Sequence, residues 1–144
     1  MKKERRLLLE YRNIIDELRH MGVIRTSKVV GDYGETVVIR ALKLTRNRKN
    51  NEKGYDTKDK DGKKYEIKTR KKVKWNEPTR FPLSKKQIEH FDFLVLVYFD
   101  DNWKLIDVLR IPKTKLEKED IKKGRILKKN IWGVYKKYSI LYKF

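Results

Sequence analysis

Apolar residues recur at three- and four-residue steps near the start of the chain, which is the spacing of one face of an α-helix. Charged residues occupy most of the other positions, and Gly22 suits the end of such a helix. The sequence therefore predicts an N-terminal amphipathic helix within residues 1–22. Its apolar face is expected to pack on the core of the domain, with a partner subunit as the alternative. That face consists of Leu7, Leu8, Tyr11, Ile14, Ile15 and Leu18.

A second helical pattern begins after Thr26 or Ser27, either of which can cap a helix, and runs to about Leu44. Apolar residues along one side of it predict contact with a sheet. The opposite side is expected to face solvent. That stripe consists of Lys28, Asp32, Thr36, Arg40 and Lys43.

Two glycines, Gly31 and Gly34, lie inside this second helix. Each lowers helix propensity by about 1 kcal/mol, so we expect a packing reason, namely a close approach of the helix to a sheet. Glu35 falls at the border between the apolar and the solvent-facing sides. It either comes close to the side chains that the sheet carries or remains a solvated glutamate.

A β-hairpin is predicted by the dipeptide Asp61-Gly62 and by the alternation of residues 65–70 that follow it. A two-residue loop would pair Thr57 with Glu66 and turn Asp56 to the opposite face. A three-residue loop, residues 60–62, would shift the register by one residue and place Asp56 opposite Glu66. Glycine suits the third position of the longer loop, so we expect the register that puts Asp56 and Glu66 on one face.

Residues 93–99 form a continuous apolar run, which is typical of a central strand buried on both faces. Residues 103–111 alternate in character and predict a strand that returns beside it. With the hairpin, these strands predict a mixed central β-sheet of about four to five strands flanked by helices, an α/β fold at the α+β border. A chain of 144 residues fits one domain, 1–144, with a core at 27–111 and a C-terminal extension at 112–144.

The charge of the chain indicates a class of partner. Lys and Arg number 39 against 20 Asp and Glu, a formal net charge of +19. Such an excess repels itself in the folded state unless a polyanion neutralises it, so nucleic acid is the expected partner. The alternatives are an anionic membrane surface and a lysine-rich surface of the thermophile type, although the latter enriches Glu together with Lys.

The residue types that are absent narrow the chemistry further. The chain has no cysteine, which excludes disulfides and thiolate metal sites, and His20 and His90 lie far apart. No apolar run approaches the ~18 residues that a membrane span needs. Residues 7–9 are too short an apolar run for the core of a signal peptide. We therefore expect a soluble, cytoplasmic protein that does not enter a membrane.

Two carboxylates and a lysine gather on the predicted hairpin of this otherwise basic chain. Asp56 and Glu66 supply oxygen ligands of the kind that Mg²⁺ accepts, and the carbonyl of Ile67 is a further ligand. Lys68 can hold or deprotonate an attacking water, or offset developing charge. These residue types suit metal-assisted phosphodiester hydrolysis. An exposed hairpin with cross-strand ion pairs is the alternative.

These residues also resemble the PD-(D/E)xK nuclease superfamily. The resemblance covers about residues 27–111 and implies a restriction-endonuclease-like core that cleaves DNA with Mg²⁺, for which Mn²⁺ is able to substitute. By this match Glu35, Asp56, Glu66 and Lys68 would be catalytic, and the three acids would bind the metal together with Ile67. The segments that carry the resemblance are Gly31-Asp32-Tyr33-Gly34-Glu35, Gly54-Tyr55-Asp56 and Tyr65-Glu66-Ile67-Lys68. Tyr55 stands where the family often has proline, and the spacing from the first sheet acid to the second is near the short end for the family.

The sequence thus predicts a Mg²⁺-dependent DNA endonuclease, restriction-like or repair-type. The alternatives are a structure-specific enzyme similar to the archaeal-type Holliday junction resolvases, and a basic nucleic-acid-binding protein without catalysis. A homodimer is expected because cutting both strands takes two sites. Basic residues around the site are expected to contact the phosphates of double-stranded or branched DNA. They are Arg46, Arg48, Lys49, Arg70, Lys71, Lys72, Lys74 and Arg80.

Overall fold

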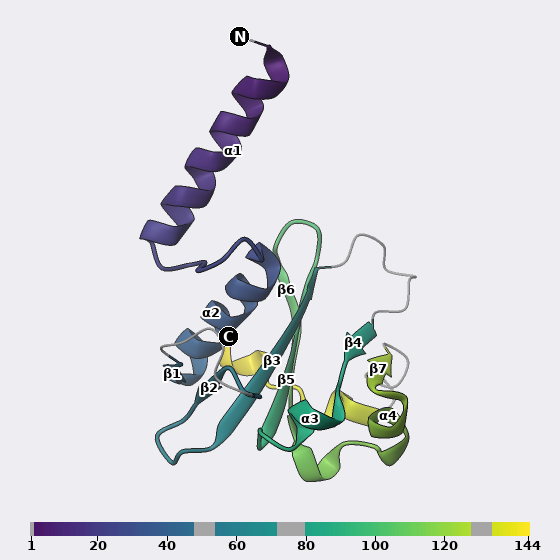
Figure 1. Cartoon of the computed structure of the whole chain (residues 1–144). Coiled ribbons are helices and arrows are strands. Elements are labelled where there is room, and N and C mark those ends of the chain that lie inside the picture. Colours follow the sequence, from purple (N-terminus) through teal and green to yellow (C-terminus); the bar gives the residue numbers. More distant parts are fainter. Residues whose placement is uncertain (1, 48–53, 72–79, 128–133) are drawn as a thin grey trace.

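A mixed sheet with helices packed beside it forms the body of the protein, as the sequence predicts (Figure 1). The computed structural model describes residues 2–47, 54–71, 80–127 and 134–144. Among these, the β3–β5 pair of the main sheet is parallel and its other pairs are antiparallel. From edge to edge its five described strands are β1 (Thr45–Arg46), β2 (Thr57–Lys58), β3 (Lys64–Lys71), β5 (Phe93–Phe99) and β6 (Leu105–Pro112).

Strand β5 is buried on both faces, which confirms the prediction from its continuous apolar run. Its even-numbered residues 94, 96 and 98 enter one hydrophobic core, which includes Phe81 and Ile126. Its odd-numbered residues 95, 97 and 99 enter a second core, which includes Val38 and Ile67. The alternation follows from the period of two along a strand. The two cores therefore lie on opposite faces of the sheet.

The hairpin between β2 and β3 has the three-residue turn that its glycine predicts. The N–H of Asp59 donates to the carbonyl of Lys63 at 3.0 Å, and Gly62 has a left-handed φ of +80°. Thr57 lies opposite Tyr65, which is the register expected from the longer loop. Pairing with β2 stops at Tyr65. Among the described residues, the remainder of β3 therefore has an open edge on this side.

Helix α2 (Val29–Leu42) packs on β3 at the close distance that one of its two glycines permits. A Cβ added at Gly34 would overlap the side chain of Thr69, so glycine is required there. A Cβ added at Gly31 would meet nothing within 4 Å. The prediction of close approach is confirmed for Gly34, whereas Gly31 borders open space.

Two residues expected on the solvent-facing stripe of α2 are buried, so this prediction is wrong. Asp32 is 6% exposed and Thr36 is 3% exposed. The Asp32 carboxylate accepts hydrogen bonds from the N–H groups of residues 25 and 26, and the Thr36 hydroxyl donates to the Val23 carbonyl at 2.8 Å. The segment before α2 thus covers this side of the helix. The predicted cap at Thr26 or Ser27 is also wrong, because α2 begins after Lys28 and has no side-chain cap.

The segments after β3 form a smaller layer against one face of β5. Strand β4 (Arg80–Pro82) pairs antiparallel with β7 (Arg125–Leu127). Ser84 and Gln87 form a capping box at the start of α3 (Lys85–Ile88). The C-terminal part returns to β6 through a bridge between Ser139 and Leu109. The short helices of this part are η1 (Lys113–Lys115), α4 (Lys118–Lys123), η3 (Lys136–Tyr138) and η4 (Leu141–Lys143).

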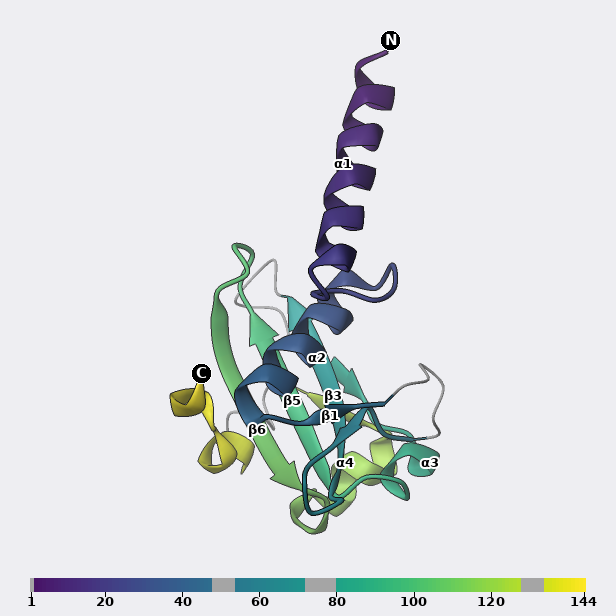
Figure 2. The ribbon, with the colours of Figure 1, turned by 90° about the vertical axis from the view of Figure 1, so that its left-hand side faces the viewer.

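Helix α1 (Lys3–His20) forms as predicted, but it does not lie on the core. It projects away from the sheet and from α2 (Figures 1 and 2). Among its described residues, Ile15 is the buried one. The expectation that its apolar face packs on the domain is therefore wrong, and the alternative of a partner subunit remains. In the part of the chain that the structure describes, no helix combines the length and apolar character needed to cross a bilayer.

Alanine at Gly34 is expected to destabilise the protein by about 1–3 kcal/mol, because the new methyl group would overlap Thr69. Gly31→Ala is the matched control in the same helix. It is expected to be as stable as the wild type or more stable, because alanine favours helix by about 1 kcal/mol and meets nothing there. Denaturant unfolding of both variants measures the difference. Equal midpoints would contradict the close packing of α2 on β3.

Candidate functional site

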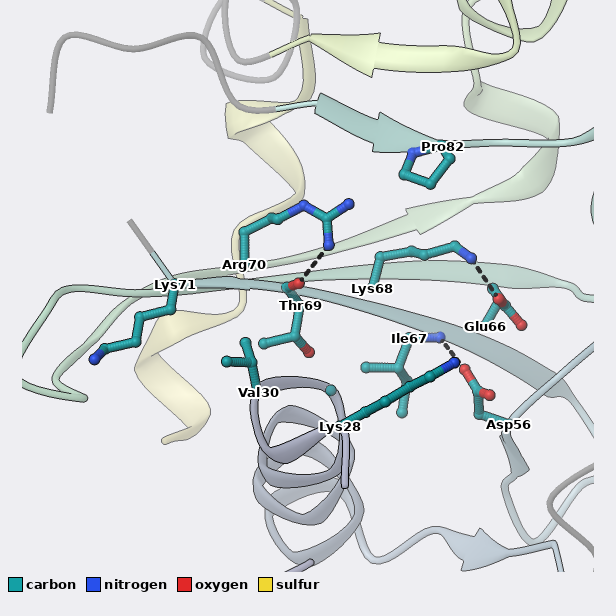
Figure 3. A pocket seen from close by; sticks show the side chains of 11 residues that line it. Lys28, Val30, Asp56, Glu66, Ile67, Lys68, Thr69, Arg70, Lys71 and Pro82 are labelled. Atoms are coloured by element: carbon teal, nitrogen blue, oxygen red, sulfur yellow. Dashed lines mark hydrogen bonds and ion pairs between the residues drawn. The ribbon is translucent and has the colours of Figure 1, made fainter. Parts of the chain in front are cut away.

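A cleft of about 550 Å³ follows the open edge of β3, between the start of α2 and strand β4 (Figure 3). Residues 66–71 of β3 form its floor, with Lys28 and Gly31 on the α2 side and Pro82 on the β4 side. Of the residues predicted to be catalytic, three line the cleft and Glu35 does not. The three are Asp56, Glu66 and Lys68.

Asp56 is held beside β3 by the turn at Gly54 and by backbone contacts. Gly54 has a φ of +85°, and a Cβ added there would overlap the side chain of His90, so only glycine fits. The N–H of Asp56 donates to the Tyr65 carbonyl at 2.8 Å. A carboxylate oxygen of Asp56 accepts the N–H of Ile67 at 2.7 Å. The carboxylate thus supplies the hydrogen-bond partner that β2 no longer provides to this edge of β3.

Glu66 and Lys68 point to the same side of β3 because side chains alternate along a strand. Lys68 Nζ lies 2.9 Å from Glu66 Oε1, and the side chains are 17% and 9% exposed. Figure 3 shows this ion pair above the Asp56 carboxylate. The cleft therefore holds an ammonium group next to two carboxylates.

Glu35 approaches this cluster from α2 but is held by an arginine. Arg25 Nη2 lies 3.2 Å from Glu35 Oε2, and the Arg25 guanidinium also donates to the Asn47 carbonyl at 3.3 Å. The charge of Asp56 raises the pKa of Glu35, and the charge of Glu35 raises the pKa of Glu66. Glu35 therefore acts on the two sheet acids electrostatically without lining the cleft.

Burial and mutual repulsion raise the pKa values of all three carboxylates, and burial is the largest cause for each. The pKa of Glu35 rises from 4.5 to about 7, through burial and then Asp56, although Arg25 lowers it. The pKa of Asp56 rises from 3.8 to about 6, through burial and then Glu66. Burial also raises the pKa of Glu66, although Lys68 lowers it. A bound cation would stabilise the ionised form of these neighbouring carboxylates.

The donor set fits Mg²⁺ in type, because this ion takes oxygen ligands from one or two carboxylates and keeps several waters. The N–H and C=O of one strand residue face the same neighbour. The Ile67 carbonyl therefore lies on the side of β3 where its N–H meets Asp56. As they stand, no three acidic or histidine side chains among the described residues form a group that could hold a metal ion. Coordination of a metal by Glu66 would compete with its ion pair to Lys68.

The residues predicted to contact DNA differ in whether they line the cleft, face solvent or turn inward. Arg70 and Lys71 line the cleft, and Arg70 Nε donates to the Arg80 carbonyl at 3.1 Å. Arg80 is exposed on β4. Arg46 turns inward and donates to the Thr36 hydroxyl at 2.7 Å. Four of the predicted residues lie outside the described residues. They are Arg48, Lys49, Lys72 and Lys74.

Two basic residues of the site are not singled out by the sequence pattern. Lys28 lines the cleft, and its side chain extends in the direction of Asp56 in Figure 3. Arg25 holds Glu35. Lys28 was expected only on the solvent-facing stripe of the second helix, and Arg25 precedes the residues that were expected to cap it. The sequence points to these two residues only through their position just before the helix that carries Glu35.

The cleft thus combines two carboxylates, a lysine and a basic border, which is a set that can bind a cation and a phosphate together. Metal-assisted attack of water on a phosphodiester would need groups of these types. A scan of the chain against protein-family models finds no match, and a search of the curated proteins finds none either.

Proposed function

We propose that this chain is a Mg²⁺-dependent DNA endonuclease of the PD-(D/E)xK type on a restriction-endonuclease-like core. The observation that carries the proposal is the meeting of Asp56, Glu66 and Lys68 at one cleft, with the pKa values of both acids raised. The formal net charge of +19 supports a polyanionic substrate.

Each residue has a role that follows from its position. Asp56 and Glu66 would hold Mg²⁺ together with the Ile67 carbonyl, and Glu35 would tune this set through its charge. When bound, the cation lowers the pKa of a coordinated water and offsets charge on the phosphate. Lys68 orients the attacking water or stabilises the charge that builds on the phosphate oxygens.

Basic side chains along the cleft would position the DNA backbone. Lys28 borders the cleft just before α2, and Arg70 and Lys71 extend its floor along β3. Contacts of this kind go to phosphates, so they fix the placement of DNA without reading its sequence. Affinity is therefore expected to fall steeply with salt.

Cleavage of supercoiled plasmid and of branched DNA, each with Mg²⁺ or with EDTA, tests the proposal. We expect cutting with Mg²⁺ or Mn²⁺ and none in EDTA. Preferential cleavage of branched DNA would favour a structure-specific, resolvase-like enzyme within the same mechanism. DNA binding without cleavage in the presence of either divalent cation would contradict the proposal and leave a basic nucleic-acid-binding protein.

A further inference from the structure

A partly exposed tryptophan lies beside the cleft, in the turn that joins β5 to β6. Trp103 is 37% exposed and has a left-handed φ of +64°. Glycine adopts this conformation without strain, whereas a bulky residue is disfavoured there. A strained residue with exposed surface next to a cleft is typical of a position that contacts a ligand.

Strand pairing brings this turn to the end of the cleft. Lys71, the last residue of β3 that lines the cleft, pairs with Phe99 of β5, and the turn follows Phe99 directly. Figure 1 shows the β5–β6 turn at the same end of the sheet as the end of β3. Lys71 lies about 10 Å along β3 from Lys68. That distance corresponds to about three nucleotides of a stacked DNA strand. A strand bound at the candidate site would therefore pass close to Trp103.

The indole of Trp103 is held by two neighbouring rings. Tyr33 of α2 lies edge-on to it, with 5.5 Å between the ring centroids, and the centroid of Phe99 lies 6.1 Å away. Tyr33 and Phe99 stack on each other at 5.1 Å. Because the indole rests on this pair, little conformational freedom would be lost when a ligand stacks on it.

Lys71 connects the indole to the cleft. Its ammonium lies 4.6 Å from the centroid of the indole, and Figure 3 shows it at the opposite end of the cleft from Asp56. An aromatic ring beside a cation is the combination that binds single-stranded DNA, because a base stacks on the ring while a phosphate meets the cation. An arriving base would replace the ammonium over the ring, and the ammonium would then contact a phosphate.

We propose that Trp103 and Lys71 form a stacking site for an unpaired base of the DNA strand that occupies the cleft. In a duplex each base is already stacked between its neighbours, so only an unpaired base is available to the indole. The preferred substrate would therefore carry unpaired nucleotides next to a duplex, as overhangs and flaps do. The inference rests on DNA as the ligand of the cleft, as in the proposed function, but it does not require cleavage.

Binding of tailed duplexes in EDTA tests the stacking site without cleavage. Two labelled duplexes carry a short single-stranded tail of equal length, one with thymine bases and one abasic, so both have the same phosphates. Tails at the 5′ end and at the 3′ end are measured separately by fluorescence anisotropy. For one of the two ends, the wild type is expected to bind the thymine tail about tenfold more tightly than the abasic tail, because a stacked base contributes a factor of this size.

Substitutions of Trp103 should remove this preference. Trp103→Gly suits the left-handed turn, and Trp103→Leu keeps apolar cover over Tyr33 and Phe99. Both are expected to bind the thymine tail as weakly as the abasic tail. Trp103→Phe retains an aromatic plane and should keep part of the preference.

Tyr142→Gly is the matched control. Tyr142 is 82% exposed and has the Lys143 ammonium 6.0 Å from its ring centroid. It belongs to η4, which lies beside β6 rather than at the cleft. Its loss removes an exposed aromatic ring with a neighbouring cation, and the preference for the thymine tail should remain as in the wild type.

Two results would overturn the stacking site. One is equal affinity of the wild type for thymine and abasic tails at both ends. The other is a preference that Trp103→Gly and Trp103→Leu both keep at full strength, which would limit Trp103 to packing of the turn. The nuclease proposal fails on a different result. A thymine preference without cleavage in Mg²⁺ would support the stacking site and refute the nuclease, whereas Mg²⁺-dependent cleavage without the preference would refute only the stacking site.

Discussion

Replacing Lys68 by alanine is expected to lower the rate of DNA cleavage about 10³-fold while DNA binding stays nearly unchanged. Its ammonium lies 2.9 Å from Glu66, so its loss leaves the attacking water without an orienting donor and the developing charge without an offset. A similar loss is expected for Asp56→Asn, which removes a negative ligand but can still accept the Ile67 hydrogen bond. Single-turnover cleavage and DNA-binding titrations separate the two effects.

Lys60→Ala is the matched control for this experiment. It removes the same charge from the protein, but at an exposed turn position before β3. A wild-type rate for Lys60→Ala beside a large loss for Lys68→Ala would locate the effect at the cleft. Undiminished nicking by both Lys68→Ala and Asp56→Asn would reveal a contaminating nuclease and refute the assignment of the site.

Metal-free protein carrying Glu35→Gln is expected to be more stable than the wild type at pH 8 and equally stable near pH 4. The pKa of Glu35 is raised from 4.5 to about 7 in the folded protein. Between these two pH values the folded protein therefore keeps a proton on Glu35 that the unfolded chain has released. The wild type therefore loses stability as the pH rises through these values. This pKa shift corresponds to a loss of at most about 3 kcal/mol in the free energy of unfolding. Glutamine keeps the shape of the side chain without ionising, so the variant escapes this loss.

Denaturant unfolding between pH 4 and pH 8 in EDTA measures this difference. Asp61→Asn, an exposed acid in the β2–β3 turn, is the control and should follow the wild-type profile. Adding Mg²⁺ at pH 8 should stabilise the wild type more than Glu35→Gln, because a bound cation favours ionised carboxylates. Parallel pH profiles for the wild type and Glu35→Gln would contradict the raised pKa.

The strand register at the site could be predicted because local chemistry decides it. Gly62 takes the left-handed position of a three-residue turn, and that turn determines which residues of β2 and β3 meet. A slip of one residue would have turned Asp56 to the opposite face. With the register given, the alternation along β3 places Glu66 and Lys68 together.

The features that could not be predicted depend on contacts between distant segments. Asp32 and Thr36 are polar and lie on the polar side of α2, yet the segment before the helix covers them. Periodicity reports how polar a position is and not what lies over it. The role of Arg25 could not be predicted for the same reason, because only folding brings this residue to Glu35. The apolar face of α1 could be predicted from its spacing, but its exposure to solvent could not.

A second hairpin shows how tertiary packing overrides turn preference. The turn from Asp100 to Lys104 repeats the hydrogen bonds of the β2–β3 turn, but Trp103 holds the left-handed position at a φ of +64°. Tryptophan is disfavoured there. Its ring packs edge-on against Tyr33 at 5.5 Å, and the Lys71 ammonium lies 4.6 Å from its centroid. These contacts replace the glycine that turn rules would require.

Strand β5 forms a wall of both hydrophobic cores, with residues 94–99 at most 3% exposed. Neither the layer of α2 nor the layer of β4 and β7 can open without exposing apolar side chains of this one strand. Partial unfolding of either layer is therefore unfavourable, and the two are expected to unfold as one cooperative unit. The cleft takes its walls from α2, β3 and β4. Its geometry would accordingly be lost in a single step, together with the fold.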